Sequence, residues 1–387
     1  MTMTTLNPQS PGKRIWKRFK RHRLGYWSLW IFLTLYGISL VGELVSNDRP
    51  LIAHYEGRWY FPLWKEYPEA VFGGQLPSMT DYQDPFIREQ LSSEGNFVLY
   101  PLNPYYYDTL NYFSHATRYP APPSADNWLG IDAAGYDITA RLLYGFRISV
   151  TFALALTIIG TLLGILIGAV QGYFAGRIDL FGQRLIEIWS SMPELYLLII
   201  FAAMFNSSFI LVFILLSLFS WMQLSDYVRA EVLRNRQLEY VKSARAIGLS
   251  NSQIIWRHVL PNSMTPVITF LPFRMSAGIM ALASLDFLGL GVSSPAPSLG
   301  NLLAQGKANL DAWWIALSTF VVLVGTLLLL TFMGEALRDA LDTRMSDQQP
   351  EADEADQDEL SDATTQANTR LNIPGADKPR TPLLEAS

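Results

Sequence analysis

The sequence contains no cysteine and little charge. Among 387 residues there is no Cys and only four His, and charged residues make up 16 %. The absence of Cys excludes disulfides, thiolate zinc sites, iron–sulfur clusters and cysteine nucleophiles. His22, His54, His115 and His258 are too scattered to indicate a histidine metal site, so we expect no metal and no other cofactor. A soluble protein carries about 25 % charged residues on average, so this chain lacks the charge to cover several soluble domains.

Motifs for nucleotide binding and acyl-transfer catalysis are also missing. The nearest approach to a phosphate-binding loop pairs Gly300 with Gly306-Lys307-Ala308; its glycines are one residue too far apart, and Ala stands where magnesium needs Ser or Thr. No G-x-S-x-G motif occurs. Asp286 has no second aspartate in the other apolar runs, as an aspartyl protease would require. We therefore predict that the chain is not an enzyme and that any ATP driving it is hydrolysed by a separate subunit.

The net charge of −5 is unevenly distributed along the chain. Residues 346–387 hold 10 Asp or Glu against 3 Lys or Arg, whereas residues 1–345 hold 24 acids and 26 bases. We interpret residues 335–387 as a cytoplasmic, acidic and disordered tail. The rest of the chain is only slightly basic, which argues against nucleic acid as its main partner.

The hydrophobic residues, half of the total, are concentrated in long runs. About 20 apolar residues in a helix cross a hydrocarbon core of about 30 Å. Unpaired backbone groups are costly in lipid, so these runs should be helices rather than irregular chain. The sequence thus predicts an all-α, polytopic membrane protein embedded in a lipid bilayer. Its six expected spans are approximately 26–46, 148–171, 185–205, 208–224, 267–288 and 312–334.

Basic residues predict the orientation of the spans. Residues 1–25 are rich in Lys and Arg, which places the N-terminus in the cytoplasm by the positive-inside rule. A cleaved signal peptide is the alternative, but no small-residue cleavage site follows the long first span. Counting onward, the basic loop 225–266 falls in the cytoplasm and the loop 289–311, with one base, falls outside. The predicted topology is N-in and C-in.

The segment after the first span is predicted to be a large external insert. Residues 47–125 hold 10 of the 22 prolines and many aromatic residues. Disordered linkers are poor in aromatics, so we expect this insert to be an ordered cap rather than a flexible spacer. The whole external region, with the segment that leads to the second span, is expected over residues 47–147. The alternative is a proline-rich loop that is ordered only by resting on the helices. A five-helix core is expected to follow over residues 148–334.

The predicted cytoplasmic loop has a local sequence typical of a rigid element. Residues 226–247 are expected to be helical, and Gly248 suits the left-handed position that ends a helix. Ser250 and Gln253 then have the spacing of a capping box that begins a second short helix, 252–259. Such an element transmits motion from a soluble partner, or else it merely links the fourth and fifth spans.

Three separate stretches resemble the permeases of ABC importers, in particular the oligopeptide/dipeptide branch. EYVKSARAIG followed by HVLPN resembles the EAA loop of these permeases. The other stretches are NWLGID with RLLYGFRIS, and SLDFLGLG with PSLG. The motifs lie at 239–248 with 258–262, 127–132 with 141–149, and 284–291 with 297–300. The resemblance covers about residues 12–345 and leaves the acidic tail outside.

This resemblance implies a permease subunit of an ATP-driven importer in the bacterial inner membrane. Its expected partners are a second homologous permease, ABC ATPase subunits and a periplasmic peptide-binding protein. Oligopeptides are the implied cargo, and the branch includes importers of peptide antibiotics such as microcin C. An ion-coupled secondary transporter is the alternative; it would need internal repeats and ion-coordinating residues at broken helices, and neither is evident.

The resemblance assigns coupling to the ATPase to seven loop residues. These are Glu239, Lys242, Ser243, Ala244, Gly248, Leu260 and Pro261. Lys242 departs from the family pattern because an acidic residue is usual there. Glu239 lies three residues earlier on the same helix face and could take over that role. In the external segment, Tyr136 replaces an Arg that is common in the family.

Small residues in the second span form a stripe. Gly160, Gly164, Gly168 and Gly172 follow one another at a strict spacing of four. This is the small-xxx-small pattern that lets helix backbones approach closely, so the stripe predicts a helix-packing seam. The seam could also be the surface that slides when the transporter switches state.

A few ionisable residues fall within the predicted spans. An ionisable group there costs about 2.5 kcal/mol or more, so it should face a cavity or a partner. We predict that Glu194 lines the substrate pathway and meets the amino group of a peptide. Arg274 in the fifth span is interpreted as snorkelling to the interface.

Overall fold

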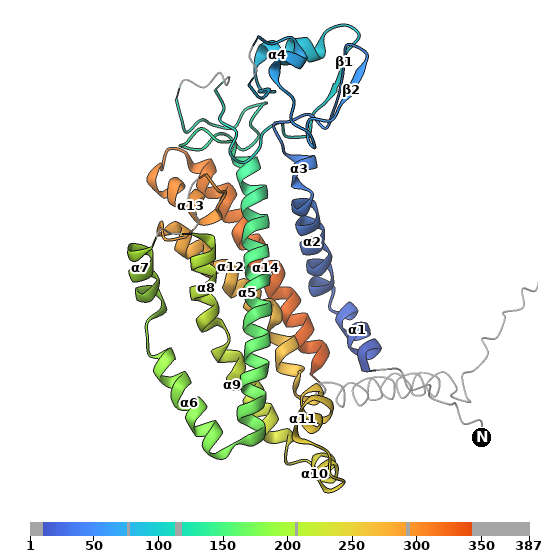
Figure 1. The fold of residues 1–387 in the computed structure, drawn as a ribbon, viewed down its shortest axis with the longest axis vertical. Helices are drawn as coiled ribbons and strands as arrows, with labels where there is room; N and C mark the ends of the chain where they lie inside the picture. The colour runs from blue at the N-terminus through green and yellow to red at the C-terminus, as the bar shows by residue number, and fades with distance from the viewer. Residues whose placement is uncertain (1–10, 76–77, 113–117, 206–207, 292–294, 343–387) are drawn as a thin grey trace, which may run out of the picture.

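The computed structural model describes residues 11–75, 78–112, 118–205, 208–291 and 295–342. They form a mostly helical molecule with long helices running side by side and a small unit at one end (Figure 1). Nearly all of the predicted acidic tail lies outside the described residues. The last described helix ends at Leu341, so helix replaces the beginning of the tail predicted at 335.

Four helical segments among the described residues are long and apolar enough to cross a membrane. They are α5 (Ile138–Phe174), α8 and α9 together (Phe209–Asn235), α12 (Thr265–Phe287) and α14 (Trp313–Leu341). They correspond to the second, fourth, fifth and sixth predicted spans. Helix α5 begins well before the predicted residue 148, because Asp137 caps it by accepting a hydrogen bond from the Ala140 amide.

The other two predicted spans differ from expectation. The third predicted span, 185–205, is interrupted: α6 (Gly176–Ser190) and α7 (Glu194–Met204) are separate helices. Pro193 precedes α7 as its N-cap, and proline tends to kink or break a helix because it lacks an amide hydrogen and its ring clashes with the preceding turn. The first predicted span corresponds to α2 (Arg23–Leu40), followed by the short α3 (Gly42–Val45). The predicted basic terminus contains a helix of its own, α1 (Pro11–Arg21).

Helix α5 lies at the centre of the bundle and packs against α9 and α12. One buried cluster joins α5 to α12, to α13 (Leu299–Ala308) and to α14, and includes the fully buried Ile138, Leu302 and Leu330. A second cluster joins α5 to α8 (Phe209–Ser220) and α12. The central helix therefore contacts most of the other long helices.

The unit after α3 contains a sheet, so the prediction of an all-α chain was incomplete. Its elements are β1 (Ile52–Tyr55), β2 (Arg58–Tyr60), a 3-10 turn η1 (Glu69–Phe72), α4 (Pro85–Ser92) and β3 (Phe97–Leu99). The antiparallel strand order is β2-β1-β3. Glu56 and Gly57 both have positive φ, which is typical of a two-residue hairpin turn. Phe72, Ile87 and Leu91 are fully buried, so this segment has its own core.

The two ends of the bundle carry different segments. The sheet-containing unit lies at one end, beyond α3 and the start of α5 (Figure 1). At the opposite end lie α1, the end of α14 and the short helices α10 (Glu239–Ala246) and α11 (Asn251–Ile254). The predicted coupling loop is therefore far from the sheet.

Candidate functional site

The predicted coupling loop consists of a series of short helices between two long ones. Helix α9 (Met222–Asn235) is followed by α10 and α11, a π-helical turn η2 (Ile255–Val259) and a 3-10 turn η3 (Pro261–Ser263) that leads into α12. The single helix predicted over 226–247 is interrupted, because Leu238 is extended and serves as the N-cap of α10. The helix predicted over 252–259 begins at Asn251 and becomes a π turn.

Local sequence explains the bend between α10 and α11. Gly248 has φ of 84°, a conformation that L side chains rarely adopt, and the amide of Leu249 reaches back to the Ala244 carbonyl at 3.2 Å. The predicted capping box is confirmed: Ser250 accepts from the Gln253 amide, and the Gln253 side chain accepts from the Ser250 amide. The bend is thus fixed by hydrogen bonds between neighbouring residues.

The inner side of the loop packs against the bundle. Two of the seven predicted coupling residues, Ala244 and Leu260, are buried there. Their cluster also contains Val241, Ile254 and Val259 from the loop, and Ala169, Tyr173, Val228 and Val232 from α5 and α9. These two residues therefore hold the loop in place rather than forming its outer surface.

Tyr173, at the end of α5, contacts three parts of the loop. Its hydroxyl donates to Asn251 Oδ1 at 2.9 Å, and its carbonyl accepts from Arg236 Nη1 at 2.8 Å. The Arg245 guanidinium lies over its ring, 5.7 Å from the centroid. Sequence reasoning missed Tyr173, and no local pattern marks it apart from its position after Gly172.

A second buried contact links the beginning and the end of the loop. Asn235 Nδ2 donates to Ser263 Oγ at 2.9 Å, and Ser263 Oγ donates to the Val259 carbonyl at 2.9 Å. Both side chains are buried, so each would be costly to leave without a partner. Together with Tyr173, this contact makes the loop a rigid extension of α5, α9 and α12.

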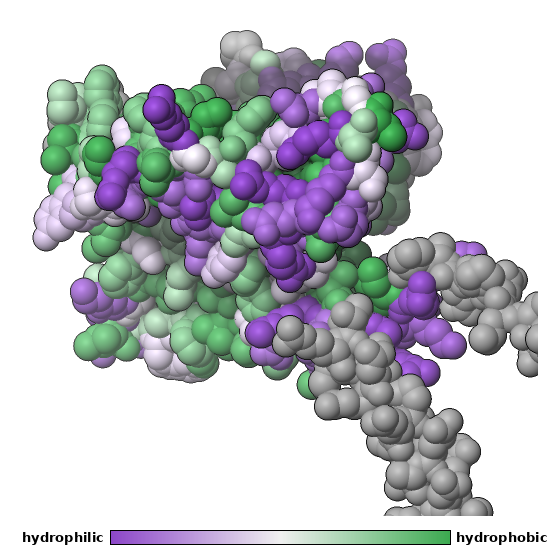
Figure 2. Space-filling view, turned by 90° about the horizontal axis from the view of Figure 1, so that it is seen from below, coloured by the Kyte–Doolittle hydropathy of each residue, from purple (hydrophilic) through white to green (hydrophobic). Residues whose placement is uncertain are grey.

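The outer side of the loop exposes charged and apolar residues. Glu239 and Lys242 form an exposed ion pair of 2.8 Å. Lys242 stands where the family motif has an acidic residue, and the nearby carboxylate of Glu239 is bound to this lysine. Ser243, Gly248 and Pro261 are also exposed. Ile247 is 76 % exposed, and Trp256 and Leu238 are exposed as well. Figure 2, seen from this end of the molecule, shows hydrophilic surface mixed with apolar side chains.

The four glycines of the stripe lie against α8 and α9. A Cβ added at Gly168 would be 2.4 Å from the Ser225 carbonyl oxygen, and one at Gly172 would be 2.7 Å from that of Arg229. At Gly164 the Trp221 carbonyl oxygen would be 3.0 Å away. At Gly160, nearest the middle of α5, the closest atom would be Arg274 Nη2 at 2.4 Å. The stripe thus faces the helix that leads into the loop.

Glu194 and Arg274 line one cavity of about 260 Å³ between α5, α7, α8 and α12. Glu194 is half-buried in the first turn of α7. The Arg274 side chain is half-buried among these helices. Its guanidinium lies in the gap above Gly160 and donates from Nη2 to the Ser220 carbonyl at 2.9 Å.

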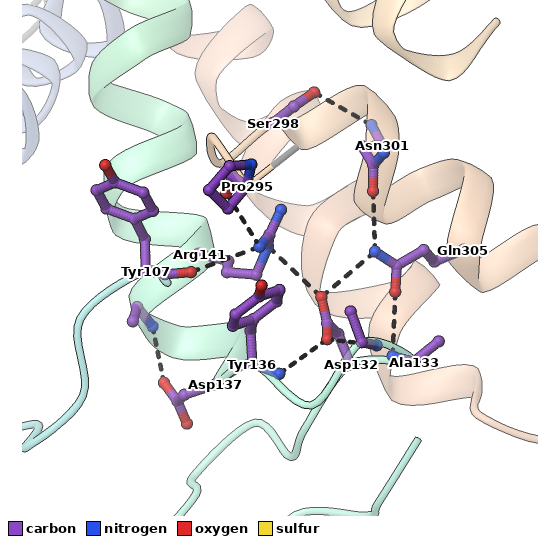
Figure 3. A network of polar contacts seen from close by, with 12 residues as sticks. Tyr107, Asp132, Ala133, Tyr136, Asp137, Arg141, Pro295, Ser298, Asn301 and Gln305 are labelled. Atoms are coloured by element: carbon purple, nitrogen blue, oxygen red, sulfur yellow. Dashed lines mark hydrogen bonds and ion pairs between the residues drawn. The ribbon is translucent and has the colours of Figure 1, made fainter. Parts of the chain in front are cut away.

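The opposite end of α5 carries a buried ion pair between two residues of the second family motif. Arg141 Nε lies 3.5 Å from Asp132 Oδ2, with both side chains almost wholly buried. Arg141 also donates to the carbonyls of Tyr107, Pro295 and Ala296, each at 3.4 Å (Figure 3). This pair joins the segment before α5 to the chain before α13.

Helix α13 is joined to the same region by polar side chains. Gln305 donates to Asp132 Oδ2 at 3.3 Å and accepts from the Ala133 amide at 3.1 Å (Figure 3). Ser298 donates to Asp286 Oδ2 at 2.5 Å. Burial raises the pKa of the Asp137 carboxyl, although side chains such as Asn127 donate hydrogen bonds to it. The family motifs contain Asp132, Asp286 and Ser298, but neither Gln305 nor Asp137.

Comparison with known proteins gives consistent matches over the whole bundle. Residues 160–347 match the family described as "Binding-protein-dependent transport system inner membrane component", and residues 10–58 match "N-terminal TM domain of oligopeptide transport permease C". The chain is 48 % identical to "Inner membrane ABC transporter permease protein YejE" of Escherichia coli (strain K12), over 88 % of this chain and 98 % of that protein.

Two further relatives extend the comparison. "Peptidoglycan transport system permease protein YejE" of Agrobacterium fabrum is 44 % identical over 89 % of this chain and 97 % of that protein. "Glutathione transport system permease protein GsiD" of Pectobacterium atrosepticum is 33 % identical over 62 % of this chain and 79 % of that protein. These matches do not favour an ion-coupled secondary transporter. The chain belongs to the binding-protein-dependent ABC transporter permeases, and it is a multi-pass, non-enzymatic permease subunit of an importer in the inner membrane.

Proposed function

We propose that this permease forms one half of a peptide pathway and couples it to ATP hydrolysis through the loop between α9 and α12. The observation that carries the proposal is the construction of this loop. It is clamped to α5 by Tyr173 and closed by the Asn235–Ser263 contact, and it still exposes Ile247 and Trp256. A rigid element with exposed apolar side chains suits a partner that pushes on it.

We further propose six membrane spans with both termini in the cytoplasm. Helix α2 is the first span, and the broken pair α6 and α7 is the third. The common position of α1, the coupling loop and the end of α14 at one end of the bundle supports this topology (Figure 1). The basic residues of α1 and of the loop support it independently, by the positive-inside rule. The sheet-containing unit would then be external.

The proposed partners are an ATPase subunit at the loop, a binding protein at the external end, and a second, homologous permease. Family membership supports the first two. The second permease is supported by α7, which contacts the bundle mainly through α8 and exposes apolar side chains such as Leu195, Tyr196 and Ile199. Coupling would be carried by the exposed residues Glu239, Lys242, Ser243, Gly248 and Pro261, with Ala244 and Leu260 supporting them from within.

Peptides are the proposed cargo. The relatives are named for transport of peptidoglycan and of glutathione, both of which contain amide-linked amino acids. We also propose that Glu194 faces the pathway, where its carboxylate would meet a peptide's ammonium group. Its position beside a cavity, without a hydrogen-bond or ion-pair partner among the described residues, supports this role.

Replacing Ile247 by aspartate should remove coupling without unfolding the permease. Ile247 is exposed and beside the glycine that ends α10, so a charge is tolerated in the isolated subunit. At an apolar interface the same charge would be desolvated, which is costly. We expect the ATPase subunit to be lost from the purified complex and ATP-driven peptide uptake to fall at least tenfold.

Leu310→Asp provides the matched control, because Leu310 is also exposed and apolar but lies outside the loop. This variant should retain the ATPase subunit during purification. If Ile247→Asp retained both the ATPase subunit and normal uptake, the proposed docking surface would be wrong.

A further inference from the structure

Two opposite charges share the cavity between α5, α7, α8 and α12. Glu194 reaches it from the first turn of α7 and Arg274 from the middle of α12. The remaining walls are mostly apolar and include Leu156, Leu216 and Phe219. Ionisable residues within membrane helices are costly and are kept for pathways, relays or counter-ions.

Neither charge is neutralised among the described residues. Arg274 makes one hydrogen bond, to the Ser220 carbonyl, and its buried Nε has no partner in the part of the chain that the structure describes. Within the same described residues, Glu194 takes part in no hydrogen bond or ion pair that would offset its burial. A guanidinium and a carboxylate left in this state favour the arrival of groups of opposite charge.

The guanidinium of Arg274 is held in position by its surroundings. Gly160 has no side chain where a Cβ would lie 2.4 Å from Nη2, and Ser220 fixes Nη2 through its carbonyl. Nε is buried and has no hydrogen-bond partner among the described residues. A planar guanidinium held in place by one hydrogen bond suits a carboxylate ligand at its remaining donors.

A second cavity of about 370 Å³ meets the first at Arg274. The two share Gln223, Arg274 and Ala277, and the second extends past Tyr227 and Phe270 to Arg338 near the end of α14. The cavity that holds both charges is smaller than the 300–1,000 Å³ typical of drug-sized ligands. It therefore suits a short peptide or one end of a longer peptide.

We propose that this cavity is a transit site for short zwitterionic peptides, in which Arg274 binds the terminal carboxylate while Glu194 faces the terminal ammonium. The inference rests on the proposed peptide cargo and adds a specific requirement: both ends of the peptide are charged when it passes.

The test compares uptake of matched peptides by the complete transporter in proteoliposomes. A dipeptide with free ends, its C-terminal amide and its N-acetyl form are chosen as peptides that the wild-type transporter carries. For each peptide the rate of a variant is divided by the wild-type rate, so that the contribution of the binding protein cancels. Hydrogen bonds to charged groups contribute about 1.5–3 kcal/mol, which corresponds to about 10- to 150-fold.

Arg274→Gln should reduce uptake of the free dipeptide at least tenfold and leave uptake of the C-terminal amide within threefold of wild type. Glu194→Gln should likewise reduce uptake of the free dipeptide at least tenfold and leave uptake of the N-acetyl form within threefold of wild type. Arg274→Lys should recover part of the activity, because it keeps the charge and loses the fork. The matched controls, Arg184→Gln and Glu187→Gln, remove an exposed ion pair on α6 and should affect all three peptides equally and little.

An equal loss for all three peptides, or no loss, would overturn the proposal. If the wild-type transporter carried no peptide at all, the proposed cargo would fail. If the transporter carried peptides but each variant affected all three peptides equally, only the transit site would be refuted, and the proposed cargo would stand.

Discussion

Replacing Arg141 by methionine is expected to lower the free energy of unfolding by about 3–5 kcal/mol, because it leaves Asp132 buried without its ion-pair partner. The Asp132 side chain is 0 % exposed and that of Arg141 is 3 % exposed. The substitution also removes the guanidinium that donates hydrogen bonds to the carbonyls of Tyr107, Pro295 and Ala296. Chemical denaturation of the purified permease in detergent measures the change.

Arg147→Met is the matched control for this prediction. Arg147 also lies on α5 and forms an ion pair with Glu43 at 2.7 Å, but both of these side chains are about one-third exposed. Such pairs contribute about 0–1 kcal/mol, so this variant should unfold near wild type. If the two variants were equally stable, the buried pair would not be holding the chain before α13 to α5.

A double variant separates the cost of the unpaired charge from the cost of lost packing. Asp132→Asn keeps an oxygen acceptor for the amides of Ala134 and Tyr136 but removes the charge. Adding it to Arg141→Met should recover part of the lost stability. No recovery would mean that the packing of the Arg141 side chain, and not its charge, dominates.

Gly168→Ala is expected to have the second largest effect on stability and to impair coupling. The added methyl group would lie 2.4 Å from the Ser225 carbonyl oxygen and 3.0 Å from Val228 Cβ. Overpacking of this kind costs about 1–3 kcal/mol, because α5 and α9 must separate. Since α9 leads directly into the coupling loop, the ATP-driven uptake should fall along with the stability.

Gly325→Ala should change stability in the opposite direction. Gly325 lies in the interior of α14, and a Cβ there would meet no atom within 4 Å. Alanine is favoured over glycine within a helix by about 0.5–1 kcal/mol, so this variant should be slightly stabilised. Denaturation midpoints of both variants, measured beside wild type, test the pair. Equal effects of the two substitutions would mean that the stripe is not a packing seam.

The sequence was most informative where structure depends on neighbouring residues. The bend at Gly248 and the capping box of Ser250 with Gln253 follow from contacts no more than five residues apart, and both were predictable. The family motifs also identified the loop. The interruption at Leu238 was not predicted, because no proline or glycine lies between residues 226 and 247 to mark it.

Apolar composition alone did not fix the number or length of the spans. Four helical segments satisfy the length and hydropathy expected of a span, whereas α2 contains several Trp and Tyr residues, and α6 and α7 divide a single apolar run. The small sheet was missed because its strands are only three or four residues long, too short for a pattern of alternation to stand out.

By itself, then, the sequence determined that this protein is a helical membrane permease with a rigid polar loop, because hydropathy, helix ends and motifs are properties of contiguous residues. Only the tertiary structure decided which distant residues meet. Arg141 reaches Asp132 and the chain at 295–296, Tyr173 clamps the loop, and Arg274 shares a cavity with Glu194. These contacts depend on how α5 packs against α8, α9 and α12, and residue spacing along one chain does not specify that geometry.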